Sequence, residues 1–260
     1  MLVATQGLVL HTTAYSESSV IVKIFTEQLG VRSYIVKGVR KPGSRAKQSL
    51  FRPLSWLDMV VYDNPHKEIN YIKEYTPLSS NQISYNESCM AIVFFMDELL
   101  YRTLRENEPM PELFHYVVEV LEGLSQSGTT QHSNNHIASL PINFLLTISR
   151  HLGIAPLDNH SLHEPVFSLS EGKFVRDPYL NIQNPNFEIQ SPPPPSDILD
   201  TECSIALHNY LESAYSDSPL PVYSAALRSK LLSILIDYYK LHLSYFGNFK
   251  SHEILHGVLA

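Results

Sequence analysis

The hydrophobic pattern of this chain changes its period once, close to residues 76–81. Before this segment, apolar and β-branched residues form short runs separated by turn-forming residues, which is typical of β-strands. After it, apolar residues recur at the three- and four-residue spacing of helices. We therefore expect an α+β fold, with a β-rich N-terminal domain of residues 1–78 and a mostly α-helical domain of residues 79–260.

Five short strands are expected in the N-terminal domain, each bounded by residues that favour turns. They cover residues 3–13, 19–26, 31–37, 57–62 and 68–75. Five strands over so short a length are typical of a small closed barrel, and the OB-fold is the common five-stranded type.

The remaining chain is expected to form helices around an irregular insertion at about 153–195. The helices are predicted at 87–106, 111–124, 141–152, 197–214 and 221–243, with a polar loop at 125–139. The first helix is apolar around much of its circumference, so we expect it to be central and buried. Within the insertion, short strands are possible at 166–168 and 173–175, and the four prolines at 192–195 form a stiff spacer.

Charge is distributed unevenly between the two domains. The whole chain has a net charge of -7, which by itself argues against a nucleic-acid partner. Residues 1–80, however, contain 10 Lys and Arg against 6 Asp and Glu, giving +4, and residues 81–260 contain 9 against 20, giving -11. Such an asymmetry indicates two modules with different partners.

The most basic segment lies between the third and fourth predicted strands, where no acidic residue occurs between Glu27 and Asp58. Its six cations are Lys37, Arg40, Lys41, Arg45, Lys47 and Arg52. Glycine and proline residues predict a loop here, and a basic loop beside a barrel can neutralise phosphates without reading sequence. Ser44 could add a hydroxyl donor, and Tyr34 and Phe51 are candidate platforms for base stacking. The alternative is a solvated basic loop with no ligand.

Two histidine patterns suggest a metal site. His252, Glu253 and His256 form the H-E-x-x-H pattern of zinc hydrolases. The chain stops at Ala260, so a third ligand would have to come from upstream. Ser251 followed by Glu253 is also an ordinary helix start, with a cap and a negative first turn. His160 and His163 have ligand-like spacing, but no convincing second pair accompanies them. We expect no metal or other cofactor.

The sequence shows no membrane span, no signal peptide and no closely spaced cysteines. No apolar run is long enough to cross a bilayer, and the N-terminus lacks the pattern of a signal peptide, so we expect a cytoplasmic protein without a membrane partner. Cys89 and Cys203 are far apart in sequence and are expected to be buried thiols.

The N-terminal segments resemble the RecO family of recombination mediators. The matching residues are 7–12, 15–19, 25–30, 36–45 and 50–54, including K-G-V-R-K-P-G-S-R at 37–45. Weaker matches occur at 151–156 and 250–255, and nothing specific is visible over 106–145. Many family members have two Cys-x-x-Cys pairs that form a zinc site, but residues 157–179 contain no cysteine here.

The resemblance implies a non-enzymatic mediator of DNA repair and recombination. It implies an OB-fold that binds single- and double-stranded DNA and anneals complementary strands, and a partnership with RecR in loading RecA. It also implies a helical domain that engages the acidic tail of single-stranded DNA-binding protein. The candidate residues for that tail are Arg102, Arg105, Arg150, His151, Arg228 and Lys230. The alternative is that these residues tie helices together within the domain. A zinc hydrolase and an RNA-binding OB-fold adaptor remain the rival functions.

Overall fold

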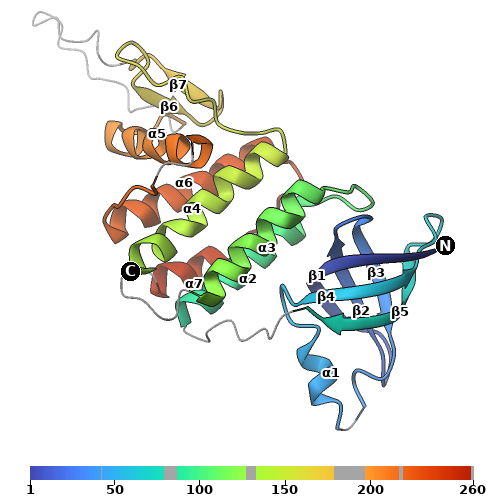
Figure 1. Ribbon diagram of the computed structural model, residues 1–260. Coiled ribbons are helices and arrows are strands. Elements are labelled where there is room, and N and C mark those ends of the chain that lie inside the picture. Colours follow the sequence, from blue (N-terminus) through green and yellow to red (C-terminus); the bar gives the residue numbers. More distant parts are fainter. Residues whose placement is uncertain (42, 79–86, 127–132, 179–196, 217–218, 259–260) are drawn as a thin grey trace, which may run out of the picture. The chain divides into compact units, whose positions relative to one another are not determined.

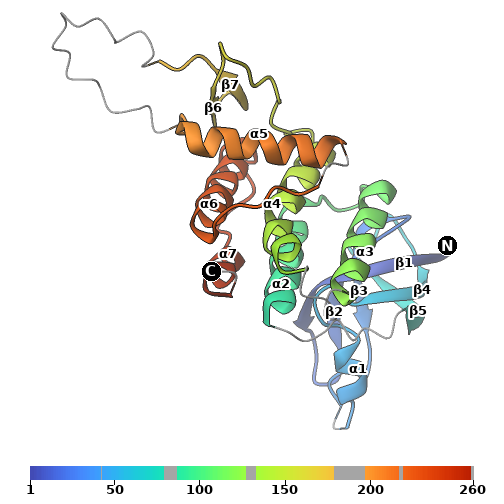
Figure 2. The same cartoon turned by 60° about the vertical axis from the view of Figure 1, so that its left-hand side comes forward.

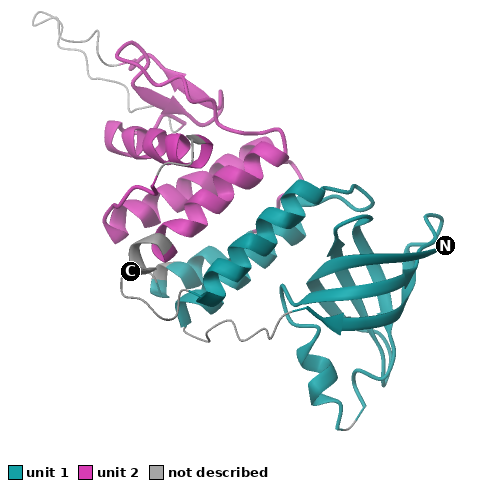
Figure 3. Ribbon diagram, in the orientation of Figure 1, with its two compact units in different colours: residues 1–133, 249–258 teal, residues 134–248, 259–260 magenta. Residues whose placement is uncertain are grey.

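The computed structural model describes residues 1–41, 43–78, 87–126, 133–178, 197–216 and 219–258 (Figure 1). The expected α+β fold is confirmed, because a closed five-stranded OB-fold barrel is followed by a mostly helical remainder. The chain divides into two compact units, residues 1–133 with 249–258 and residues 134–248 (Figure 3). The barrel and the first helices after it belong to the same unit, and the division into domains at residue 78 stays a prediction.

The barrel contains the five predicted strands in the order β1-β2-β3-β5-β4. They are β1 (Leu2–Ala14), β2 (Val20–Thr26), β3 (Gly30–Val36), β4 (Trp56–Tyr62) and β5 (Ile69–Pro77). All neighbours are antiparallel except β3 and β5. β1 is long enough to pair with β4 through its first half and with β2 through its second half, and this shared strand closes the barrel.

Alternation of apolar residues along each strand fills the barrel interior. On β2, Val20, Val22 and Ile24 are buried while Ile21 and Lys23 between them are partly exposed, as the two-residue period of a strand requires. The buried cluster also includes Tyr34 and Phe51. The inward-facing positions thus form the core, and the outward-facing positions remain available to a ligand.

Four helices belong to the same unit as the barrel: α1 (Arg45–Ser49), α2 (Glu87–Thr103), α3 (Pro111–Gln126) and α7 (Ser251–Val258). α2 is central and buried, as its sequence predicts, and it packs against α7 and against β1. Phe95 of α2 meets Phe249 edge to face, with ring centroids 5.3 Å apart. Phe25 of the barrel meets Phe114 of α3 in the same way at 5.5 Å.

The second unit contains α5 (Thr201–Ser216), α6 (Ala225–His242) and most of α4 (Ser133–His151), with a hairpin of β6 (Val166–Ser168) and β7 (Lys173–Val175). Figures 1 and 2 place α5 between this hairpin and the pair α4 and α6. Buried hydroxyl groups join the helices, since Tyr210 of α5 donates to Ser139 at 2.9 Å and Tyr239 of α6 donates to the carbonyl of Leu145 at 2.6 Å. The two short strands predicted in the insertion are confirmed.

The start of α4 was predicted wrongly. The sequence predicts a polar loop at 125–139 and a helix from Pro141, whereas α4 begins at Ser133 and continues through Pro141. The predicted starts at 197 and 221 are also early, because α5 begins at Thr201 and α6 at Ala225. Ile137 and Leu140 before the proline are buried, and so are Phe144 and Leu145 after it. Burial of this continuous apolar face outweighs the backbone hydrogen bond that proline cannot donate.

Three smaller expectations concern single features. No helix within the described ranges is both long and apolar enough to span a membrane. Cys89 and Cys203 are buried, as predicted. The proline spacer at 192–195 lies outside the described residues.

Candidate nucleic-acid interface

The basic segment between β3 and β4 is held against the barrel by apolar anchors. Val39, Phe51 and Leu54 are all buried, and Val39 and Phe51 join the barrel core. Thr12 of β1 donates a hydrogen bond to the carbonyl of Phe51 at 3.0 Å, and the N–H of Leu54 donates to the carbonyl of Val9 at 2.7 Å. The segment is therefore a folded part of the barrel.

Two turns and a short helix shape the segment. Gly38 and Gly43 have φ angles of 77° and 83°, a region that residues with a Cβ atom rarely adopt. Residues 45–49 form α1, so the expectation of a loop without regular helix is wrong for this part. The hydroxyl of Ser44 lies within hydrogen-bond distance of the carbonyl oxygens of Val39 and of Lys41, the latter at 2.6 Å, and its single proton is shared between them. Ser44 thus stabilises the turn. The expectation that its hydroxyl is free to donate to a phosphate is wrong.

The six cations of the segment all have exposed side chains. They are Lys37, Arg40, Lys41, Arg45, Lys47 and Arg52. In the described part of the chain, none of them forms an ion pair with a carboxylate. Arg40 is the most constrained, because its guanidinium donates to the carbonyl of Ser16 at 2.5 Å and its backbone N–H donates to Ser18 at 3.2 Å. The segment therefore presents concentrated positive charge with no internal compensation.

The two aromatic residues predicted as stacking platforms cannot have that role. Tyr34 is 0% exposed and Phe51 is 4% exposed, and both pack inside the barrel. Burial raises the pKa of Tyr34, and the Asp63 carboxylate raises it further. The prediction failed because proximity in sequence to the cations does not reveal on which face of the barrel an aromatic side chain lies.

Exposed tyrosines do occur on the barrel, but they are not the residues that were predicted as stacking platforms. Tyr15 follows the end of β1, Tyr62 ends β4 and Tyr71 lies on β5, with exposed fractions of 59%, 49% and 44%. A signal was available for Tyr62, because Leu57, Met59 and Val61 alternate with it along β4 and are apolar and buried. The alternation predicts that Tyr62 faces outward.

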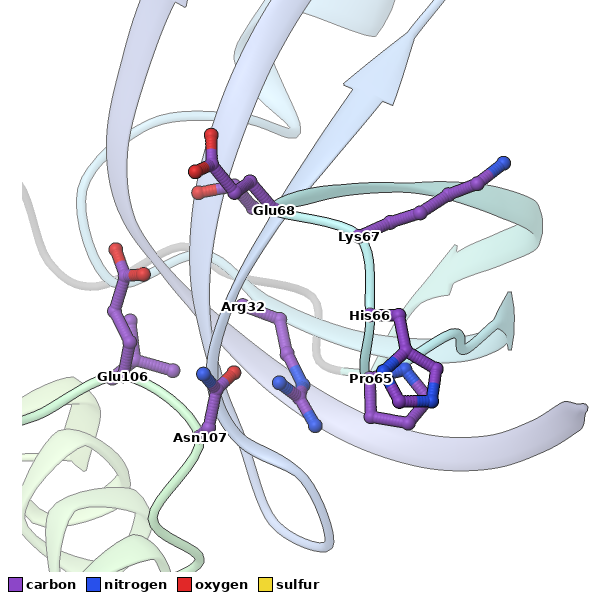
Figure 4. Close-up of a pocket in the computed structure, with 9 residues that line it drawn as sticks. Arg32, Pro65, His66, Lys67, Glu68, Glu106 and Asn107 are labelled. Atoms are coloured by element: carbon purple, nitrogen blue, oxygen red, sulfur yellow. The ribbon is translucent and has the colours of Figure 1, made fainter.

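A pocket of about 120 Å³ lies at the other end of β3 from the basic segment (Figure 4). It is lined by Val31, Arg32 and Ser33 of β3, by residues 65–68 between β4 and β5, and by Glu106 and Asn107 after α2. Arg32 is largely buried, and its Nε lies 3.5 Å from the Asp63 carboxylate. The lining contains Glu68 and Glu106 as well as basic groups, so this pocket does not favour an anion as strongly as the basic segment does.

Four of the basic residues proposed for a peptide tail contact other residues of their own units. Arg102 pairs with Glu98 at 2.8 Å on α2, and Arg150 lies over the ring of Tyr215 at 4.7 Å. Arg228 donates to the carbonyl of Tyr223, and Lys230 forms an ion pair with Asp200. Arg105 is exposed just after the end of α2, and His151 ends α4. These contacts match the alternative in which the cations hold the helices, and no peptide site is defined by them.

The histidine patterns are also explained by packing. His160 stacks on His208 with ring centroids 4.5 Å apart, and His208 contacts the Asp158 carboxylate at 2.8 Å. Burial lowers the pKa of His160, and His208 lowers it further. His163 is exposed. Among the described residues, no group of three His, Cys, Asp or Glu is arranged to hold a metal ion.

The H-E-x-x-H segment forms α7, whose first turn is capped from α2. The Glu98 carboxylate accepts the N–H groups of Ser251 at 2.7 Å and of Lys250 at 3.1 Å. Ser251 is the first helical residue and not the cap that its side chain had suggested. His252 stacks on Phe249, Glu253 is exposed, and the side chain of His256 lies outside the described residues. The cap and the Phe249 contact give this segment a structural role in its unit.

Comparison with known proteins gives matches along almost the whole chain. Residues 1–81 match the family described as recombination protein O N terminal, and residues 88–162 match recombination protein O C terminal. The chain is 28% identical over 264 residues to the DNA repair protein RecO of Azobacteroides pseudotrichonymphae, covering 99% of both chains. It is 30% identical over 258 residues to that of Phocaeicola vulgatus, covering 98% of both.

Proposed function

This chain belongs to the RecO family and has a role in DNA repair and recombination, and we propose that it fulfils this role by binding DNA phosphates with the basic segment of residues 37–52. The observation that carries the proposal is the set of six exposed cations that have no carboxylate partner among the described residues. Apolar anchors fix the backbone beneath them, so binding costs little additional ordering of the chain.

The binding is expected to depend on phosphate neutralisation and not on base reading. Lys and Arg on a turn and a five-residue helix cannot enter a groove as a long recognition helix does, but they can contact a phosphate backbone. Both single- and double-stranded DNA carry that backbone. Strand annealing follows from the same chemistry, because neutralising phosphates lowers the repulsion between two complementary strands.

Partner proteins complete the proposed role. We propose that the chain acts with RecR, that it helps to load RecA, and that it contacts the acidic tail of single-stranded DNA-binding protein. The candidates for the tail stay Arg102, Arg105, Arg150, Arg228 and Lys230, since an Arg can hold a terminal carboxylate with two hydrogen bonds. Each would have to exchange or share its present contact. The DNA site is the better supported of the two, because its cations have no carboxylate partner to exchange among the described residues.

The salt dependence of binding tests the proposed DNA site. Fluorescence anisotropy with a labelled single-stranded oligonucleotide would be measured across a salt series, with an RNA of the same sequence as competitor. Six phosphate contacts give a slope of about -4 in log affinity against log salt, at about 0.7 per contact on a single strand. A slope close to zero, or no binding at low salt, would contradict the proposal. Preference for the RNA would favour an RNA-binding adaptor.

A further inference from the structure

A row of outward-facing side chains crosses four strands of the barrel wall. Ile21 of β2 pairs with Ile35 of β3, Ile35 pairs with Tyr71 of β5, and Tyr71 pairs with Tyr62 of β4. Ile21, Ile35 and Tyr62 each lie between two buried neighbours, so their side chains point away from the core. Tyr71 lies between the buried Asn70 and the partly buried Ile72, and it is itself exposed. The register therefore assembles an apolar and aromatic row that no single segment of the sequence contains.

The two tyrosines are the exposed end of this row. Tyr62 is 49% exposed and Tyr71 is 44% exposed, whereas Ile21 and Ile35 are partly buried. Residues directly opposite on antiparallel strands have Cβ atoms about 5 Å apart, so the two tyrosines are neighbours on the outer face of the barrel. Tyrosine rings offer a flat face on which a planar group can stack.

Cations lie beside the row on the side of the basic segment. Lys37 follows Ile35 by two residues and lies in the turn that comes directly after β3. Lys73 follows Tyr71 by two residues on β5, and its charge is shared with Glu74 at 3.0 Å. Lys37 belongs to the six cations that pair with no carboxylate among the described residues. The row is thus continuous with the proposed phosphate site.

We propose that Tyr62 and Tyr71 stack on unpaired bases of a single strand whose phosphates are held by Lys37 and the rest of the basic segment. A single strand has both features that this surface complements, since it carries negative charge and exposes flat apolar faces. A duplex hides its base faces within the helical stack, so the tyrosines distinguish single-stranded from double-stranded DNA. This inference rests on the proposed DNA-binding function and adds the residues that select the unpaired form.

An oligonucleotide with abasic sites separates stacking from phosphate binding, because it keeps the charge and lacks the bases. Three labelled probes of equal length would be titrated: a single strand, its largely abasic counterpart and a duplex. The variants are the double substitution Tyr62→Ala with Tyr71→Ala, and the double substitution of both to Phe, which keeps the rings. Tyr245→Ala in the second unit is a matched control, because Tyr245 is a tyrosine of similar exposure, 46%.

The wild-type chain is expected to bind the normal single strand about tenfold or more tightly than the abasic strand, since stacking contributes about 1–3 kcal/mol per base. The double Ala variant should lose this preference and keep its affinity for the abasic strand and the duplex. The double Phe variant and Tyr245→Ala should behave as the wild type. The salt slope should be the same for all of them, because no phosphate contact is removed.

The experiment separates failure of the DNA-binding proposal from failure of the stacking proposal. If the wild type binds no probe, the proposed DNA-binding function is wrong. If the wild type binds DNA but the double Ala variant, folded by circular dichroism, keeps its preference for bases, the stacking inference is overturned and the row is left to a protein partner. If the double Ala variant does not fold, Tyr62→Ser alone provides the same comparison at the exposed end of β4.

Discussion

The cations of the basic segment and several cations of the long helices have different surroundings. The six cations of the basic segment are exposed and have no carboxylate partner among the described residues. By contrast, Arg102 and Lys230 of the helices form ion pairs with Glu98 and Asp200, and Arg150 lies over Tyr215. The side chains carry the same positive charge in both regions, but the residues that they contact differ.

Whether a cation already has a partner therefore distinguishes charges available to a ligand from charges that stabilise the fold. Exposed, unpaired cations repel each other, so clustering them costs free energy that the fold does not recover by itself. A polyanion removes that repulsion when it binds. Cations that already have a carboxylate or an aromatic partner gain less from a further ligand. Net charge alone would not have revealed this distinction.

Reversing charge in the basic segment should give the largest effect. Arg40, Lys41 and Arg45 would be replaced together by Glu, and we expect DNA affinity to fall by roughly 100-fold or more at about 0.1 M salt, with the salt slope reduced by about 2. The melting temperature should change little, because exposed charges contribute little to stability. Anisotropy with single- and double-stranded DNA measures the affinity, and circular dichroism monitors folding.

A control for this experiment is the triple reversal of Lys173, Arg176 and Lys240, which alters the net charge by the same amount in the second unit. DNA affinity should stay within about threefold of the wild type, since distant charges are screened at this ionic strength. Equal losses in both triple variants would mean that overall charge governs binding, and the comparison between the regions would fail.

Substitution of Glu98 should have the next largest effect, which is a loss of stability. Glu98→Gln removes a carboxylate that accepts hydrogen bonds from Ser251, Lys250 and Arg102, so we expect the free energy of unfolding to fall by about 2 kcal/mol. Urea unfolding measures this change. DNA affinity should be unchanged, and a loss of affinity without a loss of stability would place Glu98 in a binding site.

The pH dependence of stability gives a second test at the same residue. Burial alone would raise the pKa of Glu98, but hydrogen bonds from Ser251, Arg102 and Lys250 outweigh it and lower the pKa. A carboxyl whose pKa is lowered by folding stabilises the fold above its unfolded pKa, about 4.3, and loses this contribution as the pH falls through its folded pKa. The deficit of Glu98→Gln should therefore grow as the pH rises to about 5. At higher pH it should shrink again, because the variant also lacks the charge that raises the pKa of Asp97.

The neighbouring carboxyl should show the opposite trend with pH. Burial, and to a smaller extent the charge of the adjacent Glu98, raise the pKa of Asp97 to about 8. Between about pH 4 and pH 8 the folded chain keeps a proton that the unfolded chain loses, so this group lowers stability as the pH rises. Asp97→Asn should remove this dependence and stabilise the protein by about 1 kcal/mol or more at pH 8 relative to the wild type. Melting temperatures at pH 5 and pH 8 check the effect, which would be refuted by parallel pH profiles.

The smallest effect is expected for the ion pair of α6. Lys230 and Asp200 are each about half exposed, with side-chain values of 52% and 50%. Lys230→Ala should cost less than about 1 kcal/mol, because solvent screens such a pair. Titration with an acidic peptide tests whether Lys230 also serves a partner. Loss of peptide binding by this variant would show that a cation with a carboxylate partner can also bind a ligand. Pairing would then not distinguish the cations of the helices from those of the basic segment.

The architecture of the barrel and the position of the basic segment could be predicted from the sequence. Alternation of apolar residues located the five strands, and the absence of acidic residues between Glu27 and Asp58 marked the cations. These are local signals, because the two-residue period of a strand and the clustering of charge can be read along the chain. The wrong boundary of α4 has a local cause too, since proline is a boundary signal that burial of Ile137 and Leu140 overrides.

Which side chains lie together on the outer face of the barrel depends on the tertiary structure. Tyr34 and Phe51 lie in the chain beside the cations but belong to the core, whereas Tyr62 and Tyr71 come from different strands and meet in one cross-strand pair. Likewise, Glu98 caps a helix that begins more than 150 residues later in the chain. Strand register and helix packing join residues that are distant in sequence, and they depend on closure of the whole barrel and burial of the whole core. A pattern read along one segment does not contain that information.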